Sequence, residues 1–383
     1  MTRALVAGDP PIEAVLSVDW SGHRLLYIEA ILLEAHRQNR RQLVIVDSRA
    51  LLAPTWKRVD ALLGDHELLT VDFQTAGLRN AVPPHIQRVI VLEADHELPH
   101  IPNILRRRRD LHAVLLLMRE PGVEGLAQAA RAKAVSMTKI AFINILKVFG
   151  SRCEVHILKS PLFKVSSSTA SLVASNKART ILDPVLKLGR TAVNRTADNS
   201  VRAHTTSAKP TALVVGRIDS RKSIKSLFAA WPESVLSHCQ LVLRGEVHHE
   251  HFFELLAEAK AKGADILLDD RHLSDDELHH ALIEATVVFC LYDSSLPSGV
   301  AALAIDAGCP VIGFSHTNLG QAVSSYKLGT TVSSIDGKQL ARAIEICQGL
   351  SRSEIQKRAA CLHEHATTAH FAAQLLGSSP RST

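Results

Sequence analysis

The feature that most constrains the fold of this chain is a repeated alternation of short apolar segments with longer amphipathic ones. Short β-rich runs followed by helical patterns are typical of βαβ units, which assemble into parallel sheets covered by helices. In the first series, the expected strands are residues 3–7, 42–47, 88–93, 113–118 and 153–158, and the expected helices include 22–38 and 122–148. The pattern predicts an α/β protein.

A polar segment separates this series from a second one. Residues 189–210 are rich in Thr, Asn, Ser and Arg and end in proline, which is typical of a linker. Beyond it, the expected strands are 211–216, 240–244, 265–268, 286–291 and 309–314, and the expected helices are 222–231, 250–262, 274–284 and 299–307. Because 383 residues are too many for one core, we predict two Rossmann-like lobes facing across a cleft, with ligands at the strand ends.

The apolar segments also bear on where the protein resides. The longest, 112–118 and 285–292, are shorter than the roughly 18 to 20 residues of a membrane helix, so we interpret them as buried strands. The N-terminal stretch has only Arg3 before its apolar residues and is broken by Asp-Pro-Pro, which is unlike a signal peptide. The six cysteines are scattered without C-x-x-C spacing, as expected for reduced thiols. We expect a cytoplasmic protein.

Positive charge is concentrated in the first half of the chain. Up to residue 208 there are 28 Lys and Arg against 19 Asp and Glu, and afterwards 16 against 19. This excess indicates phosphate-bearing partners or peripheral contact with an anionic membrane surface, and the run LRRRRD at 105–110 is either such a contact or a solvated helix end. Nucleic acid is not an expected partner, because aromatic residues make up only 4% of the chain.

The segment VVGRIDSRKS at 214–223 resembles a phosphate-binding P-loop but has Arg221 where that pattern requires glycine. One interpretation is a P-loop with magnesium held by the later ILLDD segment. Another is a phosphate clamp of a different fold, in which Arg217 and Lys222 reach one diphosphate after Gly216. Arg221 competes with Lys222 for this role. A surface turn with chance cations is the third interpretation.

A second anion site is predicted after the apolar strand at 286–291. Ser298 and Gly299, followed by Val300, begin an apolar helix that ends near Gly308. The first amides of a helix have no partner within it, and the helix dipole is positive there, so this end can bind an anion. Two such sites after two strands of one sheet fit a nucleotide diphosphate better than a P-loop does.

These segments, taken in order, resemble the donor half of GT-B glycosyltransferases of the retaining family-four (group 1) kind. The resemblance covers roughly residues 211–345 and rests on VVGRIDSRKSIKSLFAAW, LVLRGE, LSDDELHHALIEATVVFCLY and AIDAGCPVIG. It implies a glycosyltransferase that uses a nucleotide-diphosphate sugar and needs no cofactor or catalytic metal. The implied domains are an acceptor-side lobe at 1–188, a linker at 189–210, a donor lobe at 211–350, and C-terminal helices at 351–383 that pack back on the lobes.

The resemblance also implies roles for individual residues. Catalysis would fall to Arg217 and Lys222, which stabilise negative charge on the leaving phosphate. The donor would be bound by Gly216, Arg221, Gly245, Asp293, Ser298, Gly299 and Val300. On the acceptor side the candidates are Asp19, Gly22 and His23, of which the histidine has a pKa suited to proton transfer or else caps the helix.

The chain departs from the family at two positions. The common pattern has two glutamates eight residues apart, and the corresponding residues here are Ser295 and Leu303. Asp293 is a candidate substitute on the sugar side. The departure leaves three alternatives: a branch with altered sugar recognition, a non-catalytic GT-B protein that binds nucleotide or partner glycosyltransferases, and a GT-B epimerase. The epimerase would need an acid and base set for which no pattern is present.

No metal motif competes with this interpretation. The run HHEH at 248–251 is spaced too tightly for one helical face and has no further ligands nearby, and no D-x-D motif is present. The expected function is transfer of a sugar from a nucleotide-diphosphate sugar to a glycan or lipid-linked acceptor, with retention, in cell-surface polysaccharide or glycoconjugate synthesis.

Overall fold

The computed structural model describes most of the chain. The described residues are 13–18, 24–53, 55–64, 66–73, 80–95, 97–118, 129–162, 166–184, 209–233, 236–292, 298–362, 364 and 366–377, with the backbone alone at 129–136. The chain divides into two compact units. Unit 1 comprises residues 1–184 and 365–383, and unit 2 comprises residues 185–364.

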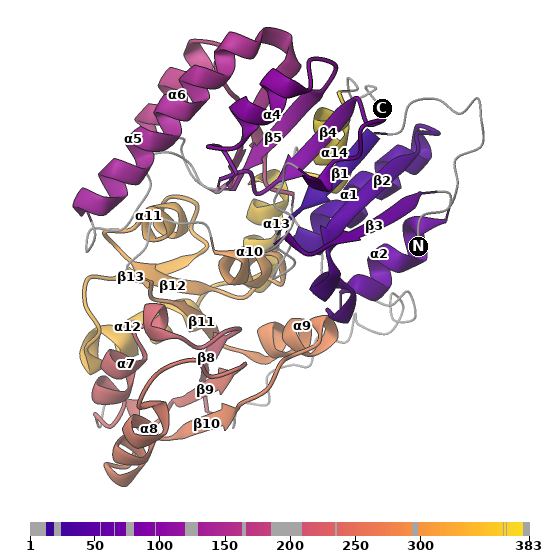
Figure 1. The fold of residues 1–383 in the computed structure, drawn as a ribbon. Helices are drawn as coiled ribbons and strands as arrows, with labels where there is room; N and C mark the ends of the chain where they lie inside the picture. The colour runs from indigo at the N-terminus through magenta and orange to yellow at the C-terminus, as the bar shows by residue number, and fades with distance from the viewer. Residues whose placement is uncertain are drawn as a thin grey trace. The chain divides into compact units, whose positions relative to one another are not determined.

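Unit 1 contains a seven-stranded sheet in the order β3-β2-β1-β4-β5-β6-β7 (Figure 1). Every neighbouring pair is parallel. The strands are β1 Glu13–Ser17, β2 Gln42–Asp47, β3 Glu67–Val71, β4 Arg88–Leu92, β5 His112–Leu117, β6 Cys153–Lys159 and β7 Arg179–Leu182. The central strands are buried along nearly their whole length, as a parallel sheet covered on both faces requires.

Helices cover both faces of this sheet. They are α1 Arg24–Arg37, α2 Trp56–Leu63, α4 Ile101–Arg107, α5 Ala129–Leu146, α6 Ser167–Ala174 and α14 Thr368–Leu376, with 3-10 turns at η1 Ser48–Leu52 and η3 Lys147–Arg152. On one face, α4, α5 and α6 pack against alternate residues of β4, β5 and β6. Elsewhere in the unit, α14 packs against α1, with the rings of Tyr27 and Phe371 5.1 Å apart between centroids.

Unit 2 contains a six-stranded parallel sheet in the order β10-β9-β8-β11-β12-β13. Its strands are β8 Thr211–Val215, β9 Gln240–Arg244, β10 Ile266–Asp269, β11 Val287–Cys290, β12 Val311–Phe314 and β13 Gly329–Val332. Its helices are α7 Ile224–Ala230, α8 Phe252–Ala261, α9 Asp275–Glu284, α10 Gly299–Asp306, α11 Asn318–Ser325, α12 Gly337–Gln348 and α13 Arg352–Leu362, with a 3-10 turn at η5 Ser220–Lys222. The predicted α/β fold with two Rossmann-like lobes is confirmed.

The last two helices belong to different units. Helix α13 packs against α10 in unit 2, where the Arg352 guanidinium donates to the carbonyl of Ala285. Helix α14 completes unit 1, because the Arg40 and Arg88 guanidinium groups donate to the carbonyls of Leu376 and Leu375 at 2.8 Å and 2.6 Å. The end of helix α14 is thus tied to the first sheet.

Some elements differ from the expected ones. The strand expected at 3–7 and nearly all of the linker expected at 189–210 lie outside the described residues. The first described strand is Glu13–Ser17, which follows two prolines and was not expected. Strands β3 and β7 were also missed, since they stand at the sheet edges and have few fully buried residues. The helix expected at 122–148 has its described part at Ala129–Leu146 and continues as a 3-10 turn.

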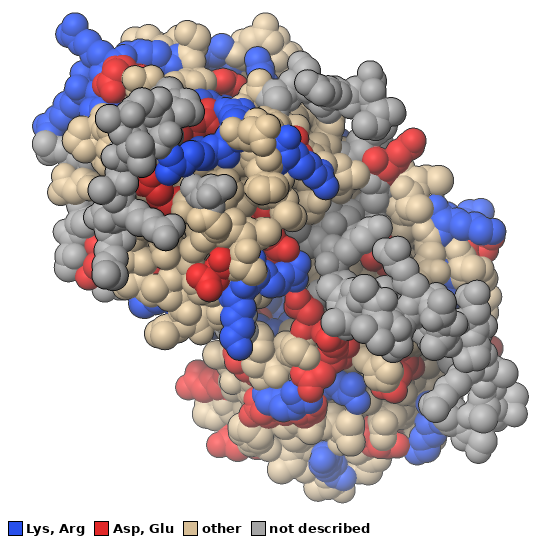
Figure 2. Space-filling model, turned by 90° about the vertical axis from the view of Figure 1, so that its right-hand side faces the viewer, with Lys and Arg blue, Asp and Glu red and all other residues tan. Residues whose placement is uncertain are grey.

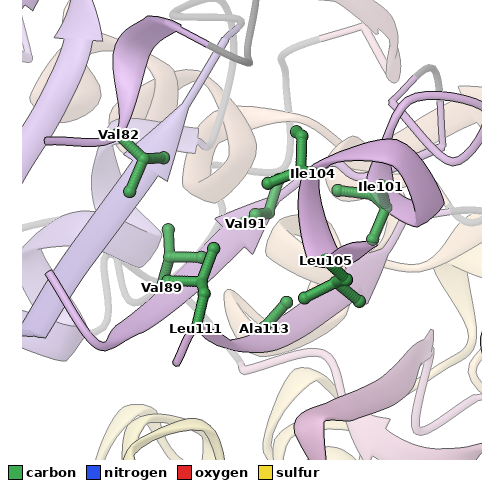
Figure 3. A pocket seen from close by; sticks show the side chains of 8 residues that line it. All are labelled: Val82, Val89, Val91, Ile101, Ile104, Leu105, Leu111 and Ala113. Carbon is green, nitrogen blue, oxygen red and sulfur yellow. The ribbon is translucent and has the colours of Figure 1, made fainter. Parts of the chain in front are cut away.

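A small cavity lies between α4 and the sheet of unit 1 (Figure 3). Its volume is about 10 Å³, roughly room for one water molecule. The lining side chains are Val82, Val89, Val91, Ile101, Ile104, Leu105, Leu111 and Ala113. Because all of them are apolar, the cavity is a packing defect of the core and has no group that could recognise a polar ligand.

Candidate functional site

The strand order of unit 2 places two loops beside each other. The chain runs outward in one direction from β8 to β9 and β10 and in the other direction from β11 to β12 and β13, so the order reverses between β8 and β11. In open parallel sheets, ligands bind at the carboxyl ends of the strands at such a switch point. The loop after β8 contains Gly216 to Lys222, and the segment after β11 leads to Ser298. The hydroxyl of Ser223 donates to the carbonyl of Leu291 at 2.9 Å and ties the two together.

Gly216 is in contact with both loops. Its φ of +81° lies in the left-handed region, where a side chain would be strained. A Cβ atom placed on it would lie 3.6 Å from Cγ2 of Val300 and 3.9 Å from Nζ of Lys222. The structure therefore brings together three of the predicted site residues, one from the strand end, one from the η5 turn and one from the first turn of α10.

Lys222 is the cation that points into this switch point. Its side chain is only 8% exposed, donates to the carbonyl of Val215, and places Nζ 5.6 Å from the ring centroid of Tyr292. Burial lowers the pKa of Lys222 to about 8, although the charges of Cys290 and Asp219 oppose the shift. An incoming anion would restore the lost solvation of the ammonium group, so this lysine is well placed to bind a phosphate.

Arg221 points elsewhere, because Asp219 holds it. The guanidinium donates to the Asp219 carboxylate at 2.6 Å and is 68% exposed, and Asp219 also caps η5 by accepting from the Arg221 backbone at 3.1 Å. Burial raises the pKa of Asp219, but the hydrogen bonds and charge of Arg221 outweigh it and keep the carboxylate ionised. Arg217 is equally exposed, at 65%, and its Nε lies 3.9 Å from the same carboxylate. Both arginines are thus surface residues around Asp219.

Ser298 begins α10 as its N-cap. Its hydroxyl accepts a hydrogen bond from the amide of Ala301 at 3.2 Å, and its side chain also hydrogen-bonds with Tyr292 and Cys290. The cap satisfies one of the four amides that a helix leaves unpaired at its start. The amides of Gly299 and Val300 donate to no other described residue, and Val300 is in contact with the Gly216 loop.

Gly245 follows β9 and has a φ of +138°. Its amide donates to the carbonyl of Asp269 at 3.0 Å, and a Cβ atom placed on it would lie 2.3 Å from the carbonyl oxygen of Gly216. The glycine was predicted to admit a nucleotide. Its closest neighbour is the chain's own backbone, so the glycine is needed to let Gly216 pack beside β9, and a nucleotide contact at Gly245 stays a prediction.

Several predicted residues cannot be placed. Asp293, Asp19, Gly22 and His23 lie outside the described residues. Of the two positions that the family fills with glutamate, Leu303 lies half-buried in α10, and Ser295 is outside the described residues.

The switch point of unit 1 lies between β1 and β4, and the predicted acceptor residues follow β1 in the sequence. Arg24 at the start of α1 donates two hydrogen bonds of 2.5 Å to the carboxylate of Glu93, which follows β4 with a φ of +56°. One turn later, the Tyr27 hydroxyl donates to Asp183 at 2.9 Å. Burial raises the pKa of Asp183 to about 6, against the effect of the Tyr27 hydrogen bond. Polar side chains thus gather at the strand ends of this unit too.

Among the described residues, no group of three or more His, Cys, Asp or Glu is arranged to hold a metal ion. Two of the three histidines of HHEH are paired with carboxylates instead: His248 lies 3.4 Å from Glu246, and His251 lies 2.9 Å from Glu254. Ser274 and Glu277 form a capping box at the start of α9. The face of the molecule shown in Figure 2 has Lys and Arg interspersed with Asp and Glu, with no single basic surface on that face.

Sequence reasoning missed two residues of this site. Asp219 decides which of the adjacent cations points inward, and its signal was an aspartate immediately before a short basic turn. Tyr292 lies beneath Lys222 and joins it to Ser298, and its signal was a lone aromatic residue at the end of a buried strand.

Known proteins resemble the chain in both sequence and fold. Residues 198–358 match the family described as glycosyl transferases group 1, while no curated protein matches the sequence. Three solved structures share its fold at low identity. Sucrose-phosphate synthase from Thermosynechococcus elongatus has a TM-score of 0.61 and 15% identity, covering 96% of this chain and 98% of its own. A trehalose-phosphate synthase from Burkholderia xenovorans, in complex with glucose-6-phosphate, has a TM-score of 0.61 and 10% identity. The match covers 96% of this chain and 99% of that one.

The third structure is Anabaena HepE in complex with UDP-glucose, with a TM-score of 0.59 and 12% identity, covering 95% of this chain and 98% of its own. At these identities the likeness shows the fold, and the family match extends over the switch point of unit 2. Residues 198–358 match the glycosyl transferases group 1 family, which identifies a glycosyltransferase domain in this part of the chain, and the whole chain has the two-lobed GT-B fold.

Proposed function

We propose that this glycosyltransferase moves a sugar from a nucleotide-diphosphate sugar to a glycan or lipid-linked acceptor, with retention, in cell-surface polysaccharide or glycoconjugate synthesis. The observation that carries the proposal is the meeting of Lys222, Gly216 and Val300 at the switch point of unit 2. The meeting of a buried ammonium group and the first amides of a helix suits a diphosphate. HepE, which shares the fold, was solved with UDP-glucose.

In the proposed reaction, the bond between the anomeric carbon and the phosphate oxygen breaks as the acceptor hydroxyl attacks from the same face, and the hydroxyl proton passes to the leaving diphosphate. Negative charge builds on the leaving diphosphate. Lys222 and the amides of Gly299 and Val300 would stabilise that charge from fixed positions, and removal of one such donor typically costs about 10²–10³ in rate. Arg217 is exposed enough to approach the same diphosphate from solvent.

The alternative is a non-catalytic protein that binds nucleotide or partner glycosyltransferases. The observation that favours it is the apolar Leu303 at one of the positions where the family has glutamate. The cations and amides at the switch point oppose a scaffold that binds only partner proteins, because such a scaffold would gain nothing from burying Lys222.

Calorimetric titration with UDP and with GDP, in the presence and absence of magnesium, tests the proposal. The Lys222→Ala variant is compared with Lys225→Ala, an exposed lysine three residues later. We expect metal-independent binding of one nucleotide, lost at least tenfold in Lys222→Ala and kept in Lys225→Ala. A protein that binds neither nucleotide while folded would exclude the proposed function.

A screen of sugar donors built on the preferred nucleotide then separates the two candidates. Release of nucleotide diphosphate from a donor sugar, faster than the spontaneous reaction, supports the enzyme. Binding of nucleotide without any turnover across donors and acceptors supports the non-catalytic protein.

A further inference from the structure

The exposed side of α5 carries a row of apolar residues between the polar Thr138 and Asn144. In the helix Ala129–Leu146, the described residues Lys139, Ile143 and Leu146 face the core of unit 1. Met137, Ala141 and Ile145 are spaced four residues apart and therefore share the opposite side, which faces solvent. A surface helix normally presents polar residues there, so this arrangement is the reverse of the usual one.

The exposed fractions on this side are large. Met137 is 62% exposed, Ile145 is 43% exposed, and Val148, in the turn η3 that continues the helix, is 84% exposed. Single exposed apolar side chains are common, but Met137, Ala141 and Ile145 on successive turns, with Val148 beyond them, form a strip. Such strips mark surfaces that contact something less polar than water.

Cations without partners among the described residues lie on the elements next to the strip. The side chains of Arg106, Arg107 and Arg109, at the end of α4, and of Lys147, in η3, form no hydrogen bond or ion pair with another described residue. From residue 129 to residue 152 the chain contains Lys and Arg but no Asp or Glu. The surface therefore offers positive charge that nothing in the described structure neutralises.

The apolar strip and the unpaired cations lie on adjacent elements. Helices α4 and α5 are in contact on one face of the unit 1 sheet (Figure 1). The guanidinium of Arg152, at the end of η3, donates to the carbonyls of Leu105 at 3.1 Å and Arg109 at 3.2 Å. These bonds fix η3 against the C-terminal end of α4. We call the seven side chains the basic–apolar patch: Arg106, Arg107, Arg109, Met137, Ile145, Lys147 and Val148.

We propose that the basic–apolar patch docks the protein on an anionic membrane surface. Apolar side chains that enter the headgroup region, together with Lys and Arg beside acidic lipids, are the two signals that stable peripheral binding requires. None of the described helices has the length and apolarity needed to cross a membrane. Docking itself does not depend on the proposed function. If the protein transfers a sugar as proposed, docking on a membrane favours a lipid-linked acceptor over a free glycan, and this step rests on the proposed function.

Vesicle sedimentation tests the docking. Wild-type protein is mixed with vesicles of phosphatidylcholine alone or with phosphatidylglycerol, at low and physiological salt. We expect binding to the anionic vesicles, weaker at higher salt. The Arg106→Glu/Arg107→Glu variant should bind at least about tenfold more weakly, since each basic side chain at an anionic surface contributes about 1 kcal/mol. Lys260→Glu/Lys338→Glu, two exposed lysines of unit 2, makes the same change of net charge and should bind like wild type.

A second pair of variants tests the apolar strip. Ile145→Ser/Val148→Ser should weaken binding several-fold without changing its salt dependence. The control Ile346→Ser/Leu52→Ser alters side chains of matched exposure, 45% and 85% against 43% and 84%, and should leave binding unchanged. Because all these residues are exposed, the fold should survive, which circular dichroism checks.

The docking inference is overturned if wild-type protein ignores anionic vesicles at low salt, or if the control variants lose binding as much as the patch variants. Either result leaves nucleotide binding in solution untouched, and a failure of nucleotide binding leaves the vesicle result untouched. The two proposals can therefore fail separately.

Discussion

The ammonium nitrogen of Lys222 lies 5.6 Å from the ring centroid of Tyr292 and donates to the carbonyl of Val215. An ammonium group over an aromatic face is attracted by the ring, by about 0.5–2 kcal/mol depending on how well water is excluded. Tyr292 in turn hydrogen-bonds with Ser298, the cap of α10. One aromatic side chain thus connects the cation after β8 with the helix start after β11.

The first prediction concerns the pH dependence of nucleotide binding. A diphosphate binds the protonated form of Lys222, whose pKa is lowered by burial to about 8. Affinity for the preferred nucleotide should therefore be level between pH 7 and about 8 and fall as pH rises further, by up to tenfold per unit. Calorimetric titration at a series of pH values above 7 measures this affinity. A flat profile up to pH 9.5 would show that Lys222 does not contact the anion.

The Tyr292 ring should shift this profile. In Tyr292→Leu the protonated lysine loses the attraction of the ring, so the decline in affinity should begin at lower pH and the Kd at pH 7 should rise by about three- to tenfold. Tyr292→Phe keeps the ring and loses only the hydroxyl, so its profile should begin to fall at the wild-type pH. Identical profiles for the leucine variant and wild type would assign the tyrosine a purely structural role.

The second prediction concerns the stability of unit 2. Gly245→Ala places a Cβ atom 2.3 Å from the carbonyl oxygen of Gly216 at a φ of +138°. The strained backbone conformation and the overpacking by the new Cβ atom each lower the free energy of unfolding by about 1–3 kcal/mol. Gly263→Ala is the matched control, since its φ is +91° but nothing lies within 4 Å of the new Cβ. Urea denaturation should show the larger loss in free energy of unfolding for Gly245→Ala, and equal losses would contradict the close approach.

The third prediction concerns the cap of α10. Ser298→Ala and Ser274→Ala each remove an N-cap hydroxyl, and each should lower the free energy of unfolding by about 1 kcal/mol. Ser298→Ala alone should also raise the Kd for nucleotide, by about three- to tenfold, because it disturbs the helix start that offers amides to the anion. If both variants or neither changed the Kd, α10 would have no part in binding.

The accuracy with which the sequence predicts secondary structure differs from one element to another. Strand β9 and helices α9 and α10 lie within two residues of their expected bounds. A continuous apolar run marks the strand, and a recognisable N-cap marks each helix. Edge strands such as β3 and β13 are short and half-buried, so no such run marks them. Their pairing depends on neighbours that are distant in the sequence.

The candidate site was predictable only in part. The residue types of the clamp followed from the sequence, but the choice between Arg221 and Lys222 did not. That choice depends on Asp219, which caps η5 and holds Arg221 at the surface. The reason for Gly245 was likewise hidden, since its contact with Gly216 joins two loops that are far apart in the chain. Contacts of this kind arise from the sheet order and cannot be read from a local pattern.

The last prediction concerns Asp183, which accepts the hydroxyl of Tyr27 at 2.9 Å in unit 1. Burial raises its pKa to about 6, above its ordinary value of 3.8. The folded state therefore binds its proton more tightly than the unfolded state does. Between about pH 4 and pH 6 this makes the free energy of unfolding fall as pH rises, and above pH 6 the charged carboxylate costs stability throughout.

Asp183→Asn removes this cost, because its amide oxygen can still accept from Tyr27 while no charge is buried. We expect the variant to exceed wild type in free energy of unfolding at pH 8, on the order of 1–2 kcal/mol, and to match it near pH 4. The Asp269→Asn variant, at the end of β10, serves as a control for loss of a carboxylate elsewhere. Urea denaturation at both pH values measures the difference. A variant less stable than wild type at pH 8 would mean that the ionised carboxylate is held by a favourable charge at the strand ends of unit 1, where an acceptor would lie.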